Sequence, residues 1–140
     1  MAGIGTIRAA LKTAANGLTS GSFTLSESRV VLGYDDVAPS ADFIGTIVSA
    51  GPYLSIRGGQ LVGVGEQVRV PTYRITAMLY FGFARETDND LTGIEGLLDV
   101  LRAAWAKPPI VDMSWSEPII NRKQSPVFGY YRIDLTAQGC

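Results

Sequence analysis

The sequence contains no histidine, and its single cysteine, Cys140, is the last of the 140 residues. Without histidine the chain lacks the commonest general base and the commonest metal ligand of proteins. One thiol cannot form an internal disulfide or a paired-cysteine metal or redox site, so we interpret Cys140 as a terminal thiol without a structural role. We therefore predict that the protein is not an enzyme and that it uses no cofactor and no metal.

Long apolar runs and an excess of charge are missing too. No apolar run reaches the roughly 18 residues of a membrane-spanning helix. The stretch "MAGIGTIRAALKTAANG" carries only Arg8 and Lys12 and no apolar core, which does not fit a secretory signal. Lys and Arg number 12 against 13 Asp and Glu, so no basic surface for gripping nucleic acid is expected. We expect a cytosolic protein, or one assembled from the cytosol, without membrane contact.

What the chain has is the composition of a globular domain. Hydrophobic residues make up 46% and charged residues 18% of the sequence, and 140 residues suffice to bury a core. No internal repeat and no linker composition is visible. We predict a single domain over residues 1–140.

Two stretches have the apolar spacing of amphipathic helices. In residues 4–18 the face comprises Ile4, Ile7, Leu11, Ala14, Ala15 and Leu18, with Thr6 as the expected N-cap and Gly17 as the stop. In residues 91–105 the stripe comprises Leu91, Ile94, Leu97, Leu98, Leu101 and Trp105. Thr92 and Glu95 have capping-box spacing, Pro108-Pro109 ends the helix, and Gly93 and Gly96 should let it lie close to the sheet.

Strand patterns fill most of the remaining chain. Residues 29–32 contain a short apolar run that predicts a strand, and residues 42–85 have strand character throughout. Within them, the run 67–84 alternates between an apolar face and a face of mixed polarity. That long strand should be central, or covered on its second side by a neighbouring subunit, with an edge position or bulge at Pro71. Residues 110–120 and 127–137 alternate as two more strands. This order predicts an α+β fold: a mostly antiparallel sheet with two amphipathic helices packed on one face.

The stretch most like a motif is Arg57-Gly58-Gly59-Gln60 in "YLSIRGGQLVGVGEQV". Gly-Gly-Gln is the catalytic tripeptide of peptide-release factors, where it lies in a long basic loop that docks on RNA. Here the tripeptide is flanked by apolar runs, and two glycines between alternating runs are typical of a two-residue hairpin turn. We predict a hairpin tip at residues 58–59, whose surroundings serve as a contact surface.

The other candidate sites are weaker. Gly63-x-Gly65 lacks the third glycine and the following helix of a dinucleotide site, and no P-loop sequence occurs. Glu86, Asp88 and Asp90 lack the other ligands of a calcium loop, so helix capping is the better explanation. No serine lies in a nucleophile elbow, and the adjacent Asp35 and Asp36 would point apart. Trp105 and Trp115 fit the core better than a base-stacking platform.

The element order resembles that of the tail terminator (tail completion) proteins of tailed bacteriophages. The resemblance covers the helix at 4–18, the strand-rich middle, the helix "DLTGIEGLLDVLRAAW" and the final strands ending in "GYYRIDLTAQG". It implies a virion protein of the tail and neck, assembled in the host cytoplasm as a ring, with a hexamer expected. Its implied partners are the tail tube and the head-tail connector, with the tail sheath as a further candidate and with DNA passing through the lumen unbound.

Two other functions stay open on the sequence. One is a head-tail adaptor or head-completion protein, and the other is a small ligand-binding or enzymatic α+β domain. A ring needs two different complementary surfaces on each subunit. The expected contact residues are the loop at 33–42 and the tetrad Arg57, Gly58, Gly59 and Gln60.

Overall fold

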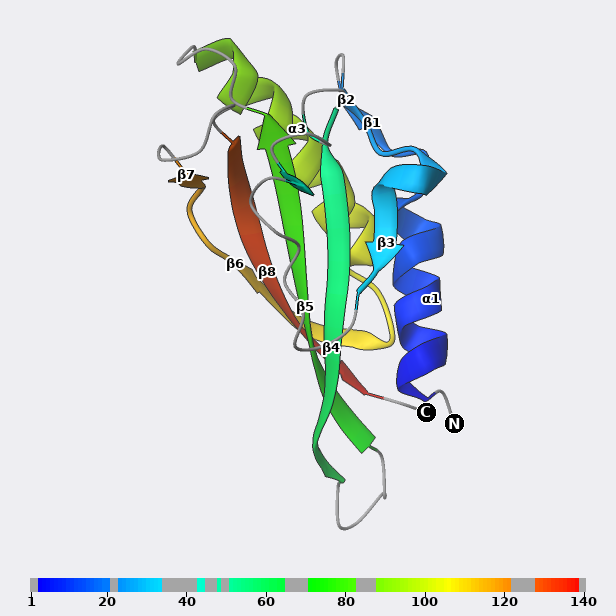
Figure 1. The fold of residues 1–140 in the computed structure, drawn as a ribbon. Coiled ribbons are helices and arrows are strands. Elements are labelled where there is room, and N and C mark those ends of the chain that lie inside the picture. The colour runs from blue at the N-terminus through cyan, green and yellow to red at the C-terminus, as the bar shows by residue number, and fades with distance from the viewer. Residues whose placement is uncertain are drawn as a thin grey trace.

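The described residues form a large mixed sheet with two long helices against one of its faces, and a small two-stranded sheet (Figure 1). This computed structural model describes residues 3–20, 23–33, 43–44, 48, 51–64, 71–82, 88–121 and 128–138, and of residues 58–64, 88–92 and 121 it describes the backbone alone. The predicted α+β class is confirmed.

The sheet has six strands: β3 (Val30–Leu32), β4 (Tyr53–Val64), β5 (Pro71–Gly82), β6 (Ile110–Trp115), β7 (Ile119–Asn121) and β8 (Phe128–Gln138). Their order is β3-β4-β5-β8-β6, with β7 also paired to β8. Only the pair β3–β4 is parallel. The strand β5 pairs along its length with β4 and β8, which confirms its predicted central position, and Pro71 is its first residue.

The first helix, α1 (Ile4–Ala15), buries the predicted face through Ile7, Leu11 and Ala15. It begins earlier than expected, because Gly3 is the N-cap and Thr6 already lies in the first turn. Gly17 has the left-handed φ of +82° that lets the chain turn sharply after the helix, as predicted.

The second helix, α3 (Asp88–Trp105), buries Ile94, Leu97, Leu98, Leu101 and Trp105 of the predicted stripe. Because it begins at Asp88, Thr92 lies inside the helix, and the predicted capping box is wrong. The Trp105 indole N–H donates a hydrogen bond of 3.0 Å to the Leu11 carbonyl oxygen. This bond joins the end of α3 to α1.

Gly93 and Gly96 bring α3 close to a small sheet that the sequence did not reveal. Strands β1 (Thr19–Ser20) and β2 (Phe23–Thr24) form a two-stranded antiparallel sheet beside the helix (Figure 1). A Cβ atom added to Gly93 would lie 2.4 Å from the Phe23 ring, and one on Gly96 would lie 2.4 Å from the Ser20 hydroxyl. The expected close approach is present, but its partner is this small sheet.

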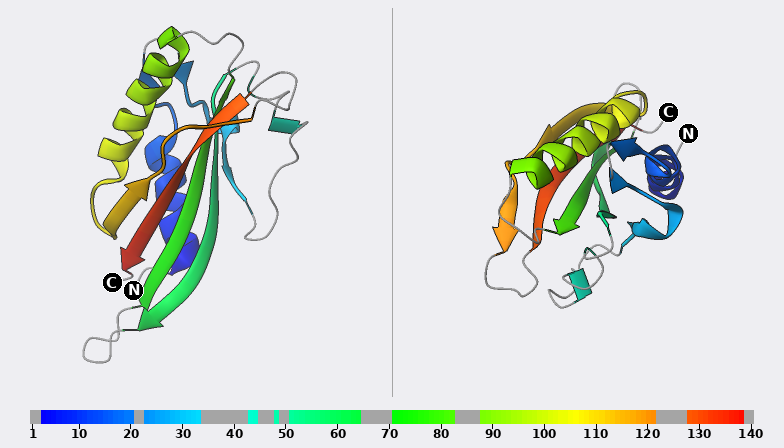
Figure 2. Two further views of the ribbon diagram at one scale, coloured as in Figure 1. Left: turned by 90° about the vertical axis from the view of Figure 1, so that its left-hand side faces the viewer. Right: turned by 90° about the horizontal axis from the view of Figure 1, so that it is seen from above.

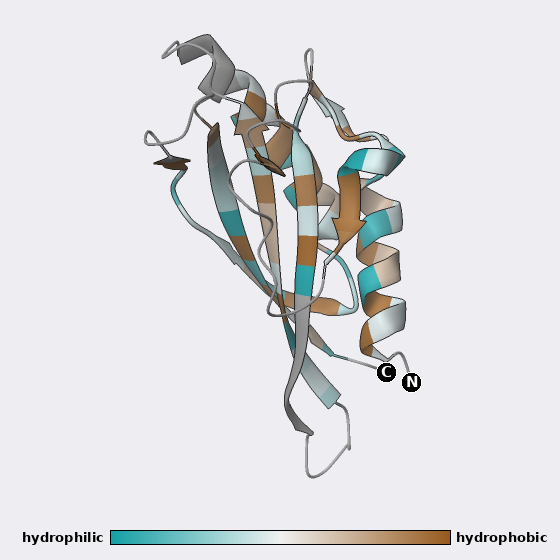
Figure 3. Cartoon of the chain, viewed as in Figure 1, coloured by the Kyte–Doolittle hydropathy of each residue, from teal (hydrophilic) through white to brown (hydrophobic). Residues whose placement is uncertain are grey.

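The main core lies between the two helices and the inner face of the sheet, as the end-on view in Figure 2 shows. Apolar and polar residues alternate along β5 and β8, which is visible as alternating bands in Figure 3. Ile75, Ala77, Leu79 and Phe81 of β5 face this core together with Tyr131, Ile133 and Leu135 of β8, as their spacing predicts. One face of the central strands β5 and β8 thus packs against the helices.

Three strand predictions need correction. The Gly58-Gly59 pair is not a hairpin tip, because β4 continues through it to Val64 and the register shift between Gly58 and Gln60 makes it a β-bulge. Phe43 and Ile44 are helical, and Val48 lies in a 3-10 turn, where the β-branched pattern predicted a strand. Another register shift, between Ile110 and Asp112, interrupts the alternation predicted for residues 110–120 and leaves Val111 exposed.

Candidate interaction surface

The sheet face opposite the helices carries a polar patch, which we call the polar sheet face. Arg74 lies opposite Thr136, Thr76 opposite Asp134, and Met78 opposite Arg132, so these side chains share one side of β5 and β8. On β6, Asp112 and Ser114 lie opposite Thr136 and Asp134 and continue the patch. The polar sheet face comprises Arg74, Thr76, Asp112, Ser114, Arg132, Asp134 and Thr136. None of these residues is buried.

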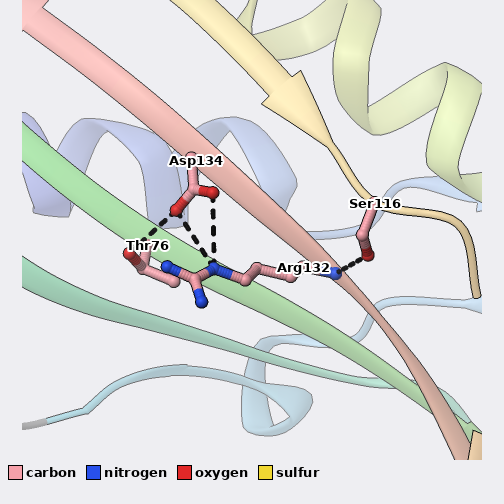
Figure 4. Close-up of polar contacts among 4 residues, drawn as sticks. All are labelled: Thr76, Ser116, Arg132 and Asp134. Carbon is pink, nitrogen blue, oxygen red and sulfur yellow. Dashed lines mark hydrogen bonds and ion pairs between the residues drawn. The ribbon is translucent and has the colours of Figure 1, made fainter. Parts of the chain in front are cut away.

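Asp134 is the centre of the contacts on this face (Figure 4). Its carboxylate accepts a hydrogen bond of 3.2 Å from the Thr76 hydroxyl. The Arg132 guanidinium lies 3.3 Å from it, with 53% of the arginine side chain and 40% of the aspartate side chain exposed. The Arg132 backbone N–H donates to the Ser116 hydroxyl at 3.0 Å. Such an exposed ion pair contributes only about 0–1 kcal/mol to stability, so the Arg132–Asp134 pair adds little to the stability of the fold.

The polar sheet face contains no catalytic arrangement. Thr76 contacts a carboxylate that is already paired with Arg132, and no activated nucleophile results. Within the part of the chain that the structure describes, no group of three acidic or cysteine side chains is placed to hold a metal ion. In the same residues, no helix is long and apolar enough to cross a membrane.

The other half of this sheet face is covered by a second, smaller core. Ile44 and Val48 pack against three aromatic side chains, Tyr53, Tyr80 and Phe128. The Tyr80 ring lies 6.3 Å from the Phe128 ring and 6.2 Å from the Tyr53 ring, between ring centres. Burial raises the pKa of Tyr53 and of Tyr80, while the positive charge of Arg57 opposes the rise. Ile44 and Val48 are therefore part of this second core, whereas the neighbouring Phe43 is 46% exposed.

Arg57 of the predicted contact tetrad lies at the border of this aromatic cluster. Its side chain is only 7% exposed, and its Nε atom donates to the Ser55 hydroxyl at 3.1 Å. Gln60 lies opposite Arg74 of the polar sheet face in the register of β4 and β5, and Gly58 lies opposite Ile75. The side chains at 58–60 and the predicted loop contacts from residue 34 to 42 lie outside the described parts, so the contact role of the tetrad stays a prediction.

Both edges of the sheet are open in the sense that no further described strand pairs with them, although the Arg8 guanidinium of α1 donates to the Gly33 and Ile56 carbonyl oxygens at the β3 edge. On one side, β3 pairs only with Leu54 to Ile56, so β4 extends without a strand beside it toward Val64, past the end of α1 in Figure 1. On the other side, β6 and β7 are the last strands. Each edge carries exposed large apolar residues: Leu32 is 37% exposed on β3, Val111 is 56% exposed on β6, and Ile119 is 43% exposed on β7. Open edges with apolar side chains are common places for association.

The edges and their apolar residues were not found from the sequence. Val111 lies in a run whose alternation predicts a regular strand, and the register shift beside it, which leaves it exposed, has no signal in the sequence. Leu32 and Ile119 belong to three-residue strands, which are too short to show a clear alternation, and the partner of β3 begins only at Tyr53. Of the other sequence candidates, Trp105 is buried as predicted and Trp115 is partly buried against the core. Asp35, Asp36, Glu86, Gly65 and Cys140 lie outside the described residues.

Comparison with known proteins finds similarity to solved structures but to no family. No family model matches the chain, and no curated protein matches it. Among solved structures, a chain of the "Virion of native gene transfer agent (GTA) particle" is similar, with a TM-score of 0.45 and 11% sequence identity over 81% of each chain. A similarity of this size assigns neither a family nor a function.

Proposed function

We propose that this chain is a structural protein of a phage-like virion that acts by assembling with copies of itself and with other virion proteins. More specifically, we propose a tail terminator: a ring, expected to be a hexamer, that caps the tail tube and joins it to the neck. The chain is then no enzyme, and its function lies in the shape of its surfaces.

The observation that supports the ring is the pair of unlike open edges. Leu32 lies on the β3 edge, whereas Val111 and Ile119 lie on the opposite edge formed by β6 and β7. A ring requires heterologous contacts, in which one surface of a subunit meets a different surface of the next. Two exposed apolar patches on opposite edges of one sheet provide such a pair. The observed element order also agrees with the order on which the resemblance to tail terminators rests.

The test places a charge on each edge in turn. Val111→Lys and Leu32→Lys change exposed residues, so each variant should remain as stable as the parent chain within about 0.5 kcal/mol. Light scattering after size exclusion, with purified tail tubes added where the chain alone stays monomeric, should show rings for the parent and none for either variant. Ala103→Lys, an exposed position on α3, is the matched control and should leave the ring intact.

Mixing the two variants makes the test sharper. Each retains one intact edge, so a heterologous contact predicts that the mixture stops at pairs of one Val111→Lys and one Leu32→Lys subunit. Rings formed by either variant alone would contradict the edge contact. A cryo-electron microscopy map of the virion that places the chain away from the neck would contradict the terminator role and leave the broader structural role standing.

A further inference from the structure

A second surface feature lies on the helix side of the molecule, between α3 and the end of β6. It is a pocket of about 210 Å³. Glu95, Leu98 and Asp99 of α3 line one wall, the segment from Trp115 to Pro118 lines the other, and Tyr131 of β8 contributes as well. This acidic pocket, as we call it, belongs neither to the polar sheet face nor to the edge residues used above.

Three carboxylates surround the acidic pocket: those of Glu95, Asp99 and Glu117. All three residues are exposed, and no ion pair ties any of them to another described residue. The neighbouring cation, Arg102, lies 3.8 Å above the centre of the Trp115 ring. The pocket therefore has an excess of negative charge beside an aromatic ring.

Tyr131 supplies the observation that indicates a ligand. Its side chain is 3% exposed, and its hydroxyl is buried without a hydrogen-bond partner. Leaving a buried hydroxyl unpaired costs about 1–3 kcal/mol, so native structures rarely do it without a reason. Burial, followed by the charges of Glu95, Glu117 and Asp99, raises the pKa of Tyr131 to about 12. The hydroxyl thus stays protonated at neutral pH, with oxygen lone pairs free to accept a hydrogen bond.

The chemistry of the pocket distinguishes between possible cations. A metal ion is disfavoured, because no three acidic groups of the described chain are placed to share one. A guanidinium group fits better, since it is planar, stacks on aromatic rings, and donates up to five hydrogen bonds to carboxylate and hydroxyl oxygens. An ammonium group has three donors and is more strongly hydrated, so it loses more on entering a partly buried site.

We propose that the acidic pocket binds an arginine side chain of a partner protein, with the carboxylates of Glu95, Asp99 and Glu117 and the Tyr131 hydroxyl accepting its hydrogen bonds. The guanidinium supplies the donor that the Tyr131 hydroxyl lacks inside the chain. This inference does not depend on the ring, because none of its residues carries the proposed edge contact.

The experiment is a titration of the full chain with N-acetyl-arginine methylamide, followed by NMR at the Trp115 indole N–H. The matched control ligand is N-acetyl-citrulline methylamide, which has nearly the same shape without the charge. We expect saturable binding of the arginine compound and at least a tenfold weaker response to citrulline.

Asp99→Asn with Glu117→Gln should weaken arginine binding at least tenfold, because charged hydrogen bonds are about twice as strong as neutral ones. Glu27→Gln, an exposed carboxylate on the 3-10 turn Glu27–Arg29, should leave it unchanged.

Tyr131→Phe separates binding from folding. It removes only the unpaired hydroxyl, so the variant should fold, and it should bind the arginine compound about threefold to tenfold more weakly. Equal binding of arginine and citrulline compounds would overturn the proposal, as would equal binding of N-acetyl-lysine methylamide. The parent chain could also bind a second copy of itself through this pocket. If the parent self-associates and Asp99→Asn with Glu117→Gln abolishes that association, the partner is a second copy and the assignment to a different protein is overturned.

Discussion

At the scale of single residues, three side chains of the described part of the chain have a buried polar atom without a hydrogen-bond partner: Arg8, Arg57 and Tyr131. Arg57, with one unpaired guanidinium nitrogen, lies beside the aromatic cluster, and Tyr131 lies at the base of the acidic pocket. Neither could be recognised from the sequence. Tyr131 occupies a regular inward position of β8, and its environment depends on Glu95 and Glu117, which come from two other elements.

The raised pKa of Tyr131 predicts how stability responds to alkaline pH. The unfolded chain ionises this tyrosine near pH 10, whereas the folded chain keeps its proton to a pKa of about 12. Between these pH values the folded state holds one more proton than the unfolded state. The stability that this tyrosine contributes is therefore intact below pH 10 and is lost as the pH rises toward 12. The free energy of unfolding should fall by about 1.4 kcal/mol per pH unit for this group.

Tyr131→Phe is the variant that isolates this effect. In urea unfolding curves measured from pH 9 to pH 12, the free energy of unfolding of this variant should fall less steeply with pH, because the part that comes from Tyr131 is missing. At pH 7 it should also raise the free energy of unfolding by about 1 kcal/mol, because an unsatisfied buried hydroxyl is removed. Tyr73→Phe, in a partly buried position on β5, is the control. A variant with the same alkaline slope as the parent would show that Tyr131 titrates normally.

At the scale of elements, the sequence predicted what depends on local periodicity. Both helices and the long strands β5 and β8 follow from apolar spacing, because their buried faces repeat regularly. The bulges at Gly58–Gln60 and Ile110–Asp112 were missed. Two glycines between apolar runs suit a turn and a bulge equally, and only the partner strand β5 decides which one forms.

The packing of α3 on the small β1–β2 sheet gives an element-scale prediction. Gly93→Ala should gain up to about 1 kcal/mol in helix propensity. The new methyl group would meet the Phe23 ring at 2.4 Å, and such overpacking costs about 1–3 kcal/mol. We expect net destabilisation of about 1 kcal/mol in urea unfolding.

A double-mutant cycle tests the cause of that loss. In a Phe23→Ala background the ring is absent, so Gly93→Ala should become neutral or stabilising. Gly5→Ala in α1, where an added Cβ would meet no atom within 4 Å, should not destabilise in either background. If Gly93→Ala cost the same free energy with and without the Phe23 ring, the close approach of α3 to β2 would not be its source.

At the scale of the whole molecule, the α+β fold divides the faces and edges of the sheet into covered and uncovered regions. The helices cover one face of the sheet, the aromatic cluster covers half of the other, and the polar sheet face and both edges are left open. The order of the long helices and strands was predictable. The positions of the open edges were not, because they depend on which distant strands become neighbours.

The charge of the polar sheet face gives the last prediction, on DNA. This face has two positive residues, Arg74 and Arg132, and two negative ones, Asp112 and Asp134, so its net charge is 2 − 2 = 0. Because binding to duplex DNA depends on neutralised phosphates, we expect no retention of a 30-base-pair duplex at 150 mM salt. Asp112→Lys with Asp134→Lys raises the charge of the face to +4 and should produce binding that weakens steeply as salt increases.

A charge-matched variant shows whether the location of the charge matters. Glu27→Lys with Glu117→Lys adds the same four charges at exposed positions away from the polar sheet face. Since the added cations are scattered, they neutralise fewer phosphates together, and the affinity for the duplex should be at least about tenfold lower than with Asp112→Lys and Asp134→Lys. Equal affinity of the two variants would show that only the total charge matters. Micromolar binding of the duplex by the parent chain would contradict a ring through which DNA passes unbound, because that affinity is typical of proteins that bind the phosphate backbone.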